Sequence, residues 1–297
     1  MRAAATWRVG IDLGGTSLRL LGESDNGERS EVTTVPTPRD YEDLLGQIES
    51  LLSSVVAGPI VSIGCGICGT LDGTRPVFVP ALPWIEDRPL GDDLAKLSEA
   101  AVVLGLDGHY ALLAEAVEGS AIGHDSVVLV AAGTGIGGAI MIDRRIWRGA
   151  RGSAGSLGWL SAPGGRDDTD HGRFEQVASG TALSEAARAY RPGWTGESLI
   201  TAARAGERGA AAVADRFGRD FGRGLAALAS VLDPEVIVIA GGLCEAMDVL
   251  SPSIDRAMRD CASPNGRHVP VRAAALGPHA GVVGALLATK LDKDIWL

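Results

Sequence analysis

The chain has 297 residues and a formal net charge of −10 at pH 7, and 46% of its residues are hydrophobic although only 4% are aromatic. No block of basic residues stands out, so the chain lacks the electrostatic footprint of a nucleic-acid-binding protein. No apolar run is long enough to span a bilayer and no signal-peptide pattern precedes the first strand, so we expect a cytoplasmic protein without a membrane partner.

The length favours two lobes. A single hydrophobic core usually stops growing near this size. The 41 glycines, together with many alanines and valines, fit a tightly packed α/β protein rather than a fibrous or disordered one. A cleft between the lobes is then the default place for a ligand.

The first predicted element is a hairpin over residues 9–21, which contains a glycine-rich turn. Gly14 and Gly15 let backbone N–H groups approach an anion closely, and Thr16 adds a hydroxyl donor. Asp12 faces the same space. An acid beside a phosphate loop repels the ligand unless a divalent cation lies between them, so Asp12 indicates Mg²⁺ held largely through water. The alternatives are a turn-capping aspartate and an ordinary tight hairpin.

Alternating strands and helices complete a first α/β lobe. The pattern predicts a strand over residues 30–35, a helix over 40–56, a buried strand over 60–67, a proline-rich loop over 76–89, a helix over 90–98 and a strand over 101–106. We expect this lobe to span residues 1–107.

Cys65 and Cys68 have the C-x-x-C spacing of metal and redox sites. No second pair accompanies them, because Cys244 and Cys261 lie far away and apart. The motif also ends a strand instead of opening a helix. Burial as small residues is therefore favoured over a redox or zinc role.

The second half repeats the opening pattern. A helix is predicted over residues 110–122, and residues 126–142 then form strand, glycine turn and strand. The second turn contains Gly133, Thr134, Gly135 and Gly137. Two such turns can bind one polyphosphate from opposite sides, which neither turn would indicate alone.

A long loop and further helices follow. Residues 148–173 are rich in glycine, aspartate and arginine, and loops of this length in compact domains tend to be functional. Later elements are predicted as helices over 181–190 and 210–232, a strand over 236–240 that ends in Gly241 and Gly242, a strand over 269–275 and a helix that ends near residue 291.

The ordered set of motifs resembles the ROK family of sugar kinases, within the actin-like, hexokinase-like ATPase superfamily. The matching segments are 12–16 and 133–138 as phosphate motifs, 236–242 as the adenosine motif, and 148–155, 178–183 and 280–285. The resemblance implies an α/β, two-lobed actin-like or ribonuclease H-like ATPase fold whose cleft closes on sugar and ATP with Mg²⁺. The lobes would be residues 1–107 and 108–283, with a last helix over 284–297 packing back on the first lobe.

The resemblance also assigns roles. Family members are kinases or repressors, and the early first strand leaves no room for the helix-turn-helix of a repressor, which favours a kinase. Asp107 matches the general base that accepts the proton of the attacking hydroxyl. An N-cap of the following helix is a compatible alternative for Asp107. Gly241 and Gly242 join the two turns in binding ATP, and the family suggests a homodimer.

The acceptor-binding segments depart from the family pattern. Ser156 and Trp159 stand where the family has a glutamate and a histidine that bind sugar, the histidine also joining zinc. The cysteine cluster is missing too, and His171 among aspartates cannot supply four zinc ligands, so we predict no structural zinc. Glu175 matches a glutamate that contacts sugar, and its alternative is a solvated acid in a first helical turn.

These departures leave the acceptor open. The candidate substrate-binding residues are Gly69, Asp107, Ser156, Trp159 and Glu175. Trp84 and Trp159 can cover the apolar face of a deoxy sugar, an amino sugar or a cyclitol, or pack in the core or a lid. We predict an ATP- and Mg²⁺-dependent kinase of a hexose or hexose-like polyol. The alternatives are a catalytically silent nucleotide or sugar sensor and, less favoured in so acidic a chain, a kinase that uses polyphosphate.

Overall fold

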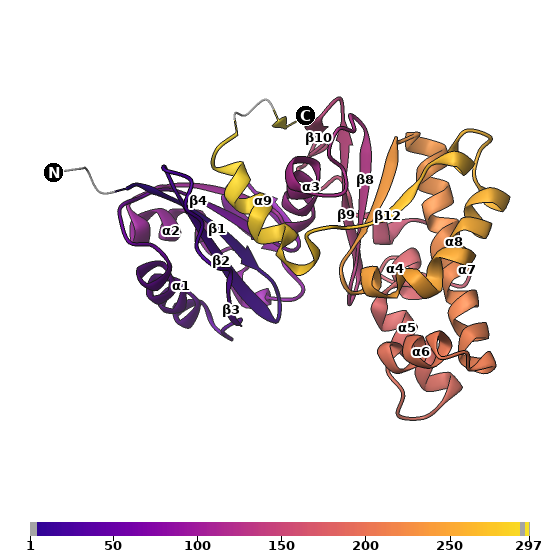
Figure 1. The fold of residues 1–297 in the computed structure, drawn as a ribbon. Coiled ribbons are helices and arrows are strands. Elements are labelled where there is room, and N and C mark those ends of the chain that lie inside the picture. Colours follow the sequence, from indigo (N-terminus) through magenta and orange to yellow (C-terminus); the bar gives the residue numbers. More distant parts are fainter. Residues whose placement is uncertain (1–4, 292–294, 297) are drawn as a thin grey trace. The chain divides into compact units, whose positions relative to one another are not determined.

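The computed structural model describes residues 5–291 and 295–296. They form two compact units (Figure 1). The first unit comprises the described parts of Met1–Gly119, Arg145–Ala154 and Pro278–Leu297, and the second comprises Ser120–Arg144 and Gly155–Gly277. The first unit thus extends past the expected boundary at residue 107, because the helix that begins there packs on the sheet and the last helix of that unit.

The first unit is built on a sheet with the strand order β3-β2-β1-β4-β7. Its strands are β1 (Trp7–Leu13), β2 (Ser17–Ser24), β3 (Thr33–Pro36), β4 (Ile60–Ile67) and β7 (Ala101–Leu106). β1 pairs antiparallel with β2, as the predicted hairpin requires, and parallel with β4. A small hairpin, β5 (Thr70–Asp72) and β6 (Arg75–Phe78), follows β4. β7 forms one edge of the larger sheet.

The two faces of this sheet are packed in different ways. Helices α1 (Tyr41–Val55) and α2 (Leu90–Ser98) bury leucines and isoleucines against one face. The other face is lined by glycines and carries α3 (Asp107–Glu118) and α9 (Ala280–Ala288). A Cβ added at Gly64 would lie 1.9 Å from the carbonyl oxygen of Ala285. The backbones of β4 and α9 therefore touch, which only glycine permits. Part of the helix predicted over 284–297 falls outside the described residues.

The second unit contains four adjacent strands of a sheet, in the order β9-β8-β11-β12. These strands are β8 (Val127–Ala132), β9 (Ile136–Ile142), β11 (Val236–Ala240) and β12 (Val271–Ala273). β8 and β9 form the second predicted hairpin, and β11 runs parallel to β8. The helices are α4 (Arg173–Ala178), α5 (Gly180–Tyr190), α6 (Gly196–Arg204), α7 (Arg208–Leu232) and α8 (Met247–Cys261). A short strand, β10 (Arg145–Ile146), belongs to the first unit.

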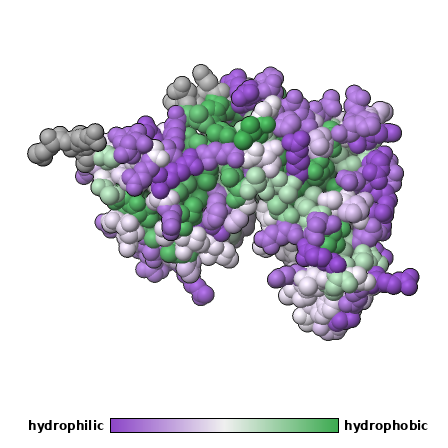
Figure 2. Space-filling view, viewed as in Figure 1, coloured by the Kyte–Doolittle hydropathy of each residue, from purple (hydrophilic) through white to green (hydrophobic). Residues whose placement is uncertain are grey.

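The predicted elements did not include three α-helices, α4, α6 and α8, and local sequence explains the omission of α6 and α8. α8 contains Pro252, which normally marks a helix break because it lacks the backbone N–H. α6 is short and follows a glycine-rich turn, although Thr195 caps it by accepting a hydrogen bond from Ser198 N at 3.2 Å. None of the helices in the described part of the chain is long and apolar enough to cross a membrane. Figure 2 shows hydrophilic side chains spread over the visible face of each unit.

Candidate functional site

The first glycine turn joins β1 to β2 and holds a nearly buried acid. Gly14 N donates to Ser17 O at 3.0 Å, which closes the turn. Asp12, at 9% exposure, lies opposite Arg19 on β2, and Arg19 Nη1 donates to Asp12 Oδ2 at 3.0 Å. Burial raises the pKa of Asp12, and the charge and hydrogen bond of Arg19 act against that rise. The pairing with Arg19 was not predicted, although a hairpin register places the two residues opposite each other.

Asp12 fits a cation held mainly through water. One of its oxygens is engaged by Arg19. Within the described ranges, no group of three His, Cys, Asp or Glu side chains is placed to hold a metal ion. Mg²⁺ commonly keeps several waters and uses one or two carboxylates, which is what a single acid can provide.

Asp107 begins α3 at the carboxyl end of β7. Its Oδ1 accepts a hydrogen bond from Gly108 N at 2.7 Å, and Leu106, not Asp107, occupies the N-cap position. Crowding by protein atoms restricts its hydration and the negative charge of Asp12 lies nearby, so the pKa of Asp107 is raised to about 7. The residue is still exposed enough for a ligand to reach it. An accessible carboxyl group with this pKa can exchange a proton near neutral pH.

Cys65 and Cys68, the C-x-x-C pair, lie beside these acids, and their thiols are unreactive. Both thiols are free, Cys65 is buried, and burial is the main cause that raises the pKa of Cys65 and of Cys68 to about 12. Thiols in this state are poor nucleophiles and poor metal ligands. Gly69 follows with φ +108°, and a Cβ there would lie 2.0 Å from Phe78 O. Glycine at this position is required by the β5–β6 hairpin, whatever its role toward substrate.

The second glycine turn, in the second unit, is held by backbone contacts. Gly180 N at the start of α5 donates to Gly133 O at 2.7 Å, and Thr181 Oγ1 donates to Thr134 O at 2.7 Å. A Cβ added at Gly133 or Gly137 would meet nothing within 4 Å. The space over these glycines is therefore open to an incoming group.

A cavity of about 320 Å³ in the second unit brings two predicted nucleotide motifs together. Gly133 of the second turn and Gly242 of the predicted adenosine motif both line it, and Glu197, Ile200, Thr201 and Arg204 of α6 form part of its wall. Gly241 has φ +80°, and a Cβ there would lie 2.6 Å from Ala132 O. The α6 wall was missed because that helix was not predicted.

Glu175 is positioned by the second turn. Its Oε2 accepts a hydrogen bond from Ile136 N at 2.7 Å, at the start of β9. The carboxylate thus fixes the exit of the glycine turn, a role that sequence did not indicate because the partners lie 39 residues apart.

The remaining acceptor candidates differ in exposure. Ser156 is exposed and precedes a short 3₁₀ helix (Leu157–Trp159), in which the Trp159 side chain is 53% exposed. Trp84 is partly buried against the core of the first unit, which fits the predicted core packing more closely than a cover for a sugar ring.

A glutamine organises the loop in which the zinc-site cysteines were expected by resemblance. Gln176 accepts a hydrogen bond from Arg166 N at 3.0 Å and donates to Arg166 O at 3.1 Å and to His171 O at 2.9 Å. These three hydrogen bonds hold both ends of the segment 166–171 next to Glu175.

The family model for the ROK family matches residues 8–291. The chain belongs to the ROK family. It is 31% identical over 303 residues to a glucokinase of Streptomyces coelicolor, covering 93% of this chain and 95% of the relative. It is 28% identical to an N-acetylmannosamine kinase of Yersinia pestis, covering 94% and 97%. A ROK glucokinase structure from Streptomyces griseus, in complex with glucose and AMPPNP, superposes with a TM-score of 0.81 at 28% identity, covering 95% of this chain and 98% of that chain.

These findings confirm the family and the actin-like ATPase fold that the motif order predicted.

Proposed function

We propose that this ROK protein is an ATP- and Mg²⁺-dependent kinase that transfers the γ-phosphate to a hydroxyl of a hexose or a hexose-like polyol. The observation that carries the proposal is the state of Asp107, an accessible carboxyl group with a pKa of about 7 beside the acid of the first glycine turn. Phosphoryl transfer needs such a group to accept the proton of the attacking hydroxyl.

The second unit supports the nucleotide part of the proposal. Its cavity is lined by Gly133 and Gly242, and the open space over Gly133 and Gly137 suits phosphate groups that approach the backbone. The names of the relatives, glucokinase and N-acetylmannosamine kinase, and the AMPPNP in the Streptomyces griseus structure agree with a sugar acceptor and a nucleotide donor.

The residues of this chain have distinct tasks in the proposed reaction. Asp107 takes the hydroxyl proton, and the hydrogen bond from Gly108 N keeps its carboxylate oriented at the start of α3. Asp12 would hold Mg²⁺ through water, and the bound ion would supply charge neutralisation on the phosphates. Arg19 keeps the Asp12 carboxylate in place. Glu175 and Gly69 are candidates for binding acceptor hydroxyls. Ser156 and Trp159 are further candidates, because Leu157 between them lies against Gly138, which follows the second glycine turn.

Coupled ADP release tests the proposal. The panel contains glucose, N-acetylmannosamine, N-acetylglucosamine, a deoxy sugar and a cyclitol, with wild type and Asp107→Asn. We expect kcat to fall by about 10²- to 10⁴-fold in the variant, while calorimetry shows little change in nucleotide affinity. Asp233→Asn, the same chemical change at the exposed residue that ends α7, is the matched control.

Two outcomes would count against the proposal. Equal turnover by wild type and Asp107→Asn would eliminate Asp107 as the base. Nucleotide binding without phosphorylated product from any member of the panel would favour the silent sensor, for which the replaced residues Ser156 and Trp159 are the motivating observation.

A further inference from the structure

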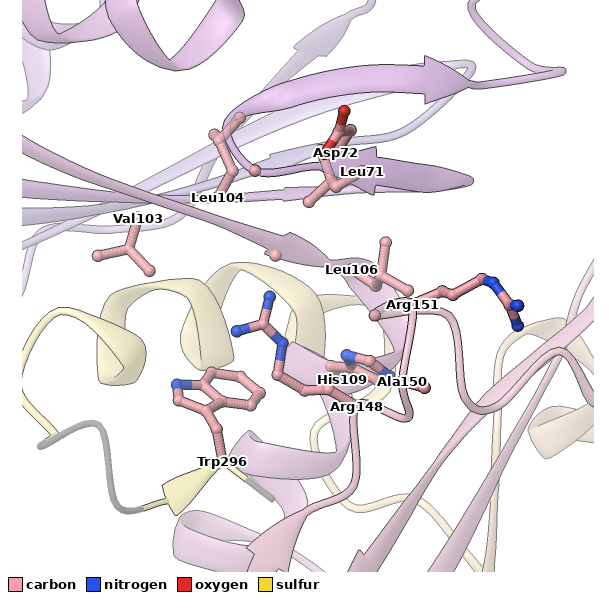
Figure 3. Close-up of a pocket in the computed structure, with 13 residues that line it drawn as sticks. Leu71, Asp72, Val103, Leu104, Leu106, His109, Arg148, Ala150, Arg151 and Trp296 are labelled. Atoms are coloured by element: carbon pink, nitrogen blue, oxygen red, sulfur yellow. The ribbon is translucent and has the colours of Figure 1, made fainter.

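A second cavity, of about 280 Å³, lies wholly within the first unit at the edge strand β7 (Figure 3). Its walls come from the β5–β6 hairpin, from β7 and the start of α3, from the segment 148–152 and from the described C-terminal residue Trp296. Neither Asp12 nor Asp107 lines it, so it is distinct from the acids assigned to the reaction. Gly105 and Leu106 do line it and directly precede Asp107.

Arg148 is the charged group that enters this cavity. Figure 3 shows its guanidinium group between the Trp296 indole and β7. The guanidinium carbon lies 5.7 Å from the centroid of the Trp296 ring. In a cation–π contact the positive charge of the guanidinium group is attracted to the face of the ring. The N–H donors of the arginine remain available to a further group. Among residues 5–291 and 295–296, Arg148 has no ion-pair or hydrogen-bond partner for its side chain.

The aromatic wall of the cavity is fixed in place. Arg145 Nη2 donates to Trp296 O at 3.0 Å, and the backbone of Trp296 forms a bridge with Ile146. The Trp296 ring centroid lies 6.3 Å from that of His109 and 6.1 Å from that of Tyr110. An indole held by these contacts loses little conformational entropy when a ligand packs on it.

The neighbouring groups leave Arg148 as the main recognition element. His109 is engaged by Ala154 O at 2.8 Å, and burial is the main cause that lowers its pKa, so it is neutral at pH 7. Arg151 lines the rim, and its side chain extends away from the cavity in Figure 3. Asp72 also lines the cavity, and Arg148 is the cationic side chain that enters it.

We propose that this cavity, which we call the Arg148 pocket, binds a small organic ligand through a carboxylate or phosphate group held by Arg148. The carbon skeleton of the ligand packs on Trp296 and on the apolar side chains of β7. Guanidinium groups match both oxyanions with paired hydrogen bonds. The cavity size limits the ligand to a small metabolite rather than a peptide or a nucleic acid.

Titrations with defined probes test the proposal. The probes are glucose 6-phosphate for the phosphate, citrate for the carboxylate, inorganic phosphate for the anion without a skeleton, and glucose as the neutral comparison. Calorimetry is performed on the full chain as wild type, Arg148→Gln, Arg148→Lys and Arg259→Gln. Arg259 lies exposed on α8 and controls for the loss of one positive charge.

We expect glucose 6-phosphate or citrate to bind wild type and Arg259→Gln, and to lose about tenfold or more in affinity in Arg148→Gln. Arg148→Lys should recover only part of the loss, because lysine keeps the charge without the planar fork. Binding should also change the tryptophan fluorescence of wild type, and Trp296→Phe should remove that change. This last readout separates the pocket from any anion site elsewhere in the chain.

Two results would overturn the proposal. One is equal affinity of every anionic probe for wild type and Arg148→Gln. The other is the absence of binding tighter than about 1 mM by any anionic probe. Both are binding measurements, so they stay distinct from the turnover results that decide the proposed function.

Discussion

The two glycine turns use the same backbone device in different electrostatic surroundings. The first turn has Asp12 at its entry, paired with Arg19, and Asp107 close enough for the two carboxyl groups to influence each other. The second turn is held by backbone hydrogen bonds, and its nearby carboxylate, Glu175, is engaged by Ile136 N. The two carboxyl groups that can take part in proton transfer therefore lie at the first turn, whereas the second turn offers uncharged N–H groups and open space.

Glycines of the first sheet and two glycines of the second turn also serve different purposes. In the first sheet, Gly10 and Gly64 allow backbone contact with α9, since a Cβ at either position would lie within 2.3 Å of a carbonyl oxygen. In the second unit, Gly133 and Gly137 face open space. Gly10 and Gly64 are thus needed for packing, and Gly133 and Gly137 leave room for a ligand. Gly135, between the last two, is packed, because a Cβ there would lie 2.3 Å from Glu175 Oε2.

The largest expected effect comes from filling a packing glycine. Gly64→Ala would place a methyl group 1.9 Å from the carbonyl oxygen of Ala285. Backbone cannot move aside as a side chain can, so we expect a loss of about 3 kcal/mol or more in the free energy of unfolding. Urea denaturation measures it. Gly46→Ala in α1 is the control, because its Cβ meets open space and alanine favours a helix. A Gly64→Ala variant as stable as Gly46→Ala would show that α9 does not pack as described.

The sequence was most informative where a local pattern fixes the backbone. Both hairpins and the strand Val236–Ala240 follow from apolar runs ending in glycine, and the helix predicted over 40–56 is α1, in which Asp40 is the N-cap. The order of the glycine motifs was sufficient to identify the family. α8 was missed because Pro252 stands inside a helix whose packing against α7 outweighs the lost hydrogen bond.

The parts of the site that sequence could not supply depend on long-range contacts. The hydrogen bond from Ile136 N to Glu175 joins residues 39 positions apart, and the cation–ring contact of Arg148 with Trp296 joins residues that are much farther apart in the sequence. Neither partner carries a motif that points to the other. The Asp12–Arg19 pair was within reach, because a two-strand register alone places these residues opposite each other.

The pH dependence of the reaction tests the role of the acids at the first glycine turn. With the pKa of Asp107 raised to about 7, the base is protonated at lower pH and ionised above. The value of kcat/KM should therefore rise with pH toward 7 and level off above it, with a loss of about 100-fold at pH 5. The profile is measured between pH 5 and 9, with circular dichroism to verify folding at each pH.

Asp12→Asn sharpens this test, because it removes the negative neighbour that helps to raise the pKa of Asp107. The pKa of the Asp107 carboxyl group, followed by carbon NMR in the absence of nucleotide, should shift downward in this variant. A flat rate profile from pH 5 to 8 would contradict Asp107 as a base with a raised pKa. An unchanged Asp107 titration in Asp12→Asn would contradict the electrostatic coupling of the two acids.

The smallest expected effect concerns the second glycine turn, which carries no charged group of its own. Gly133→Ala adds a methyl group where no protein atom lies within 4 Å, so the stability of the second unit should change by less than about 1 kcal/mol. The same methyl group occupies space over the turn that a phosphate would need, and nucleotide affinity by calorimetry should fall by about tenfold. Unchanged affinity would mean that the open space at Gly133 is not where phosphate binds. A large loss of stability would instead assign this glycine to packing, like those of the first sheet, and remove the contrast between the two units.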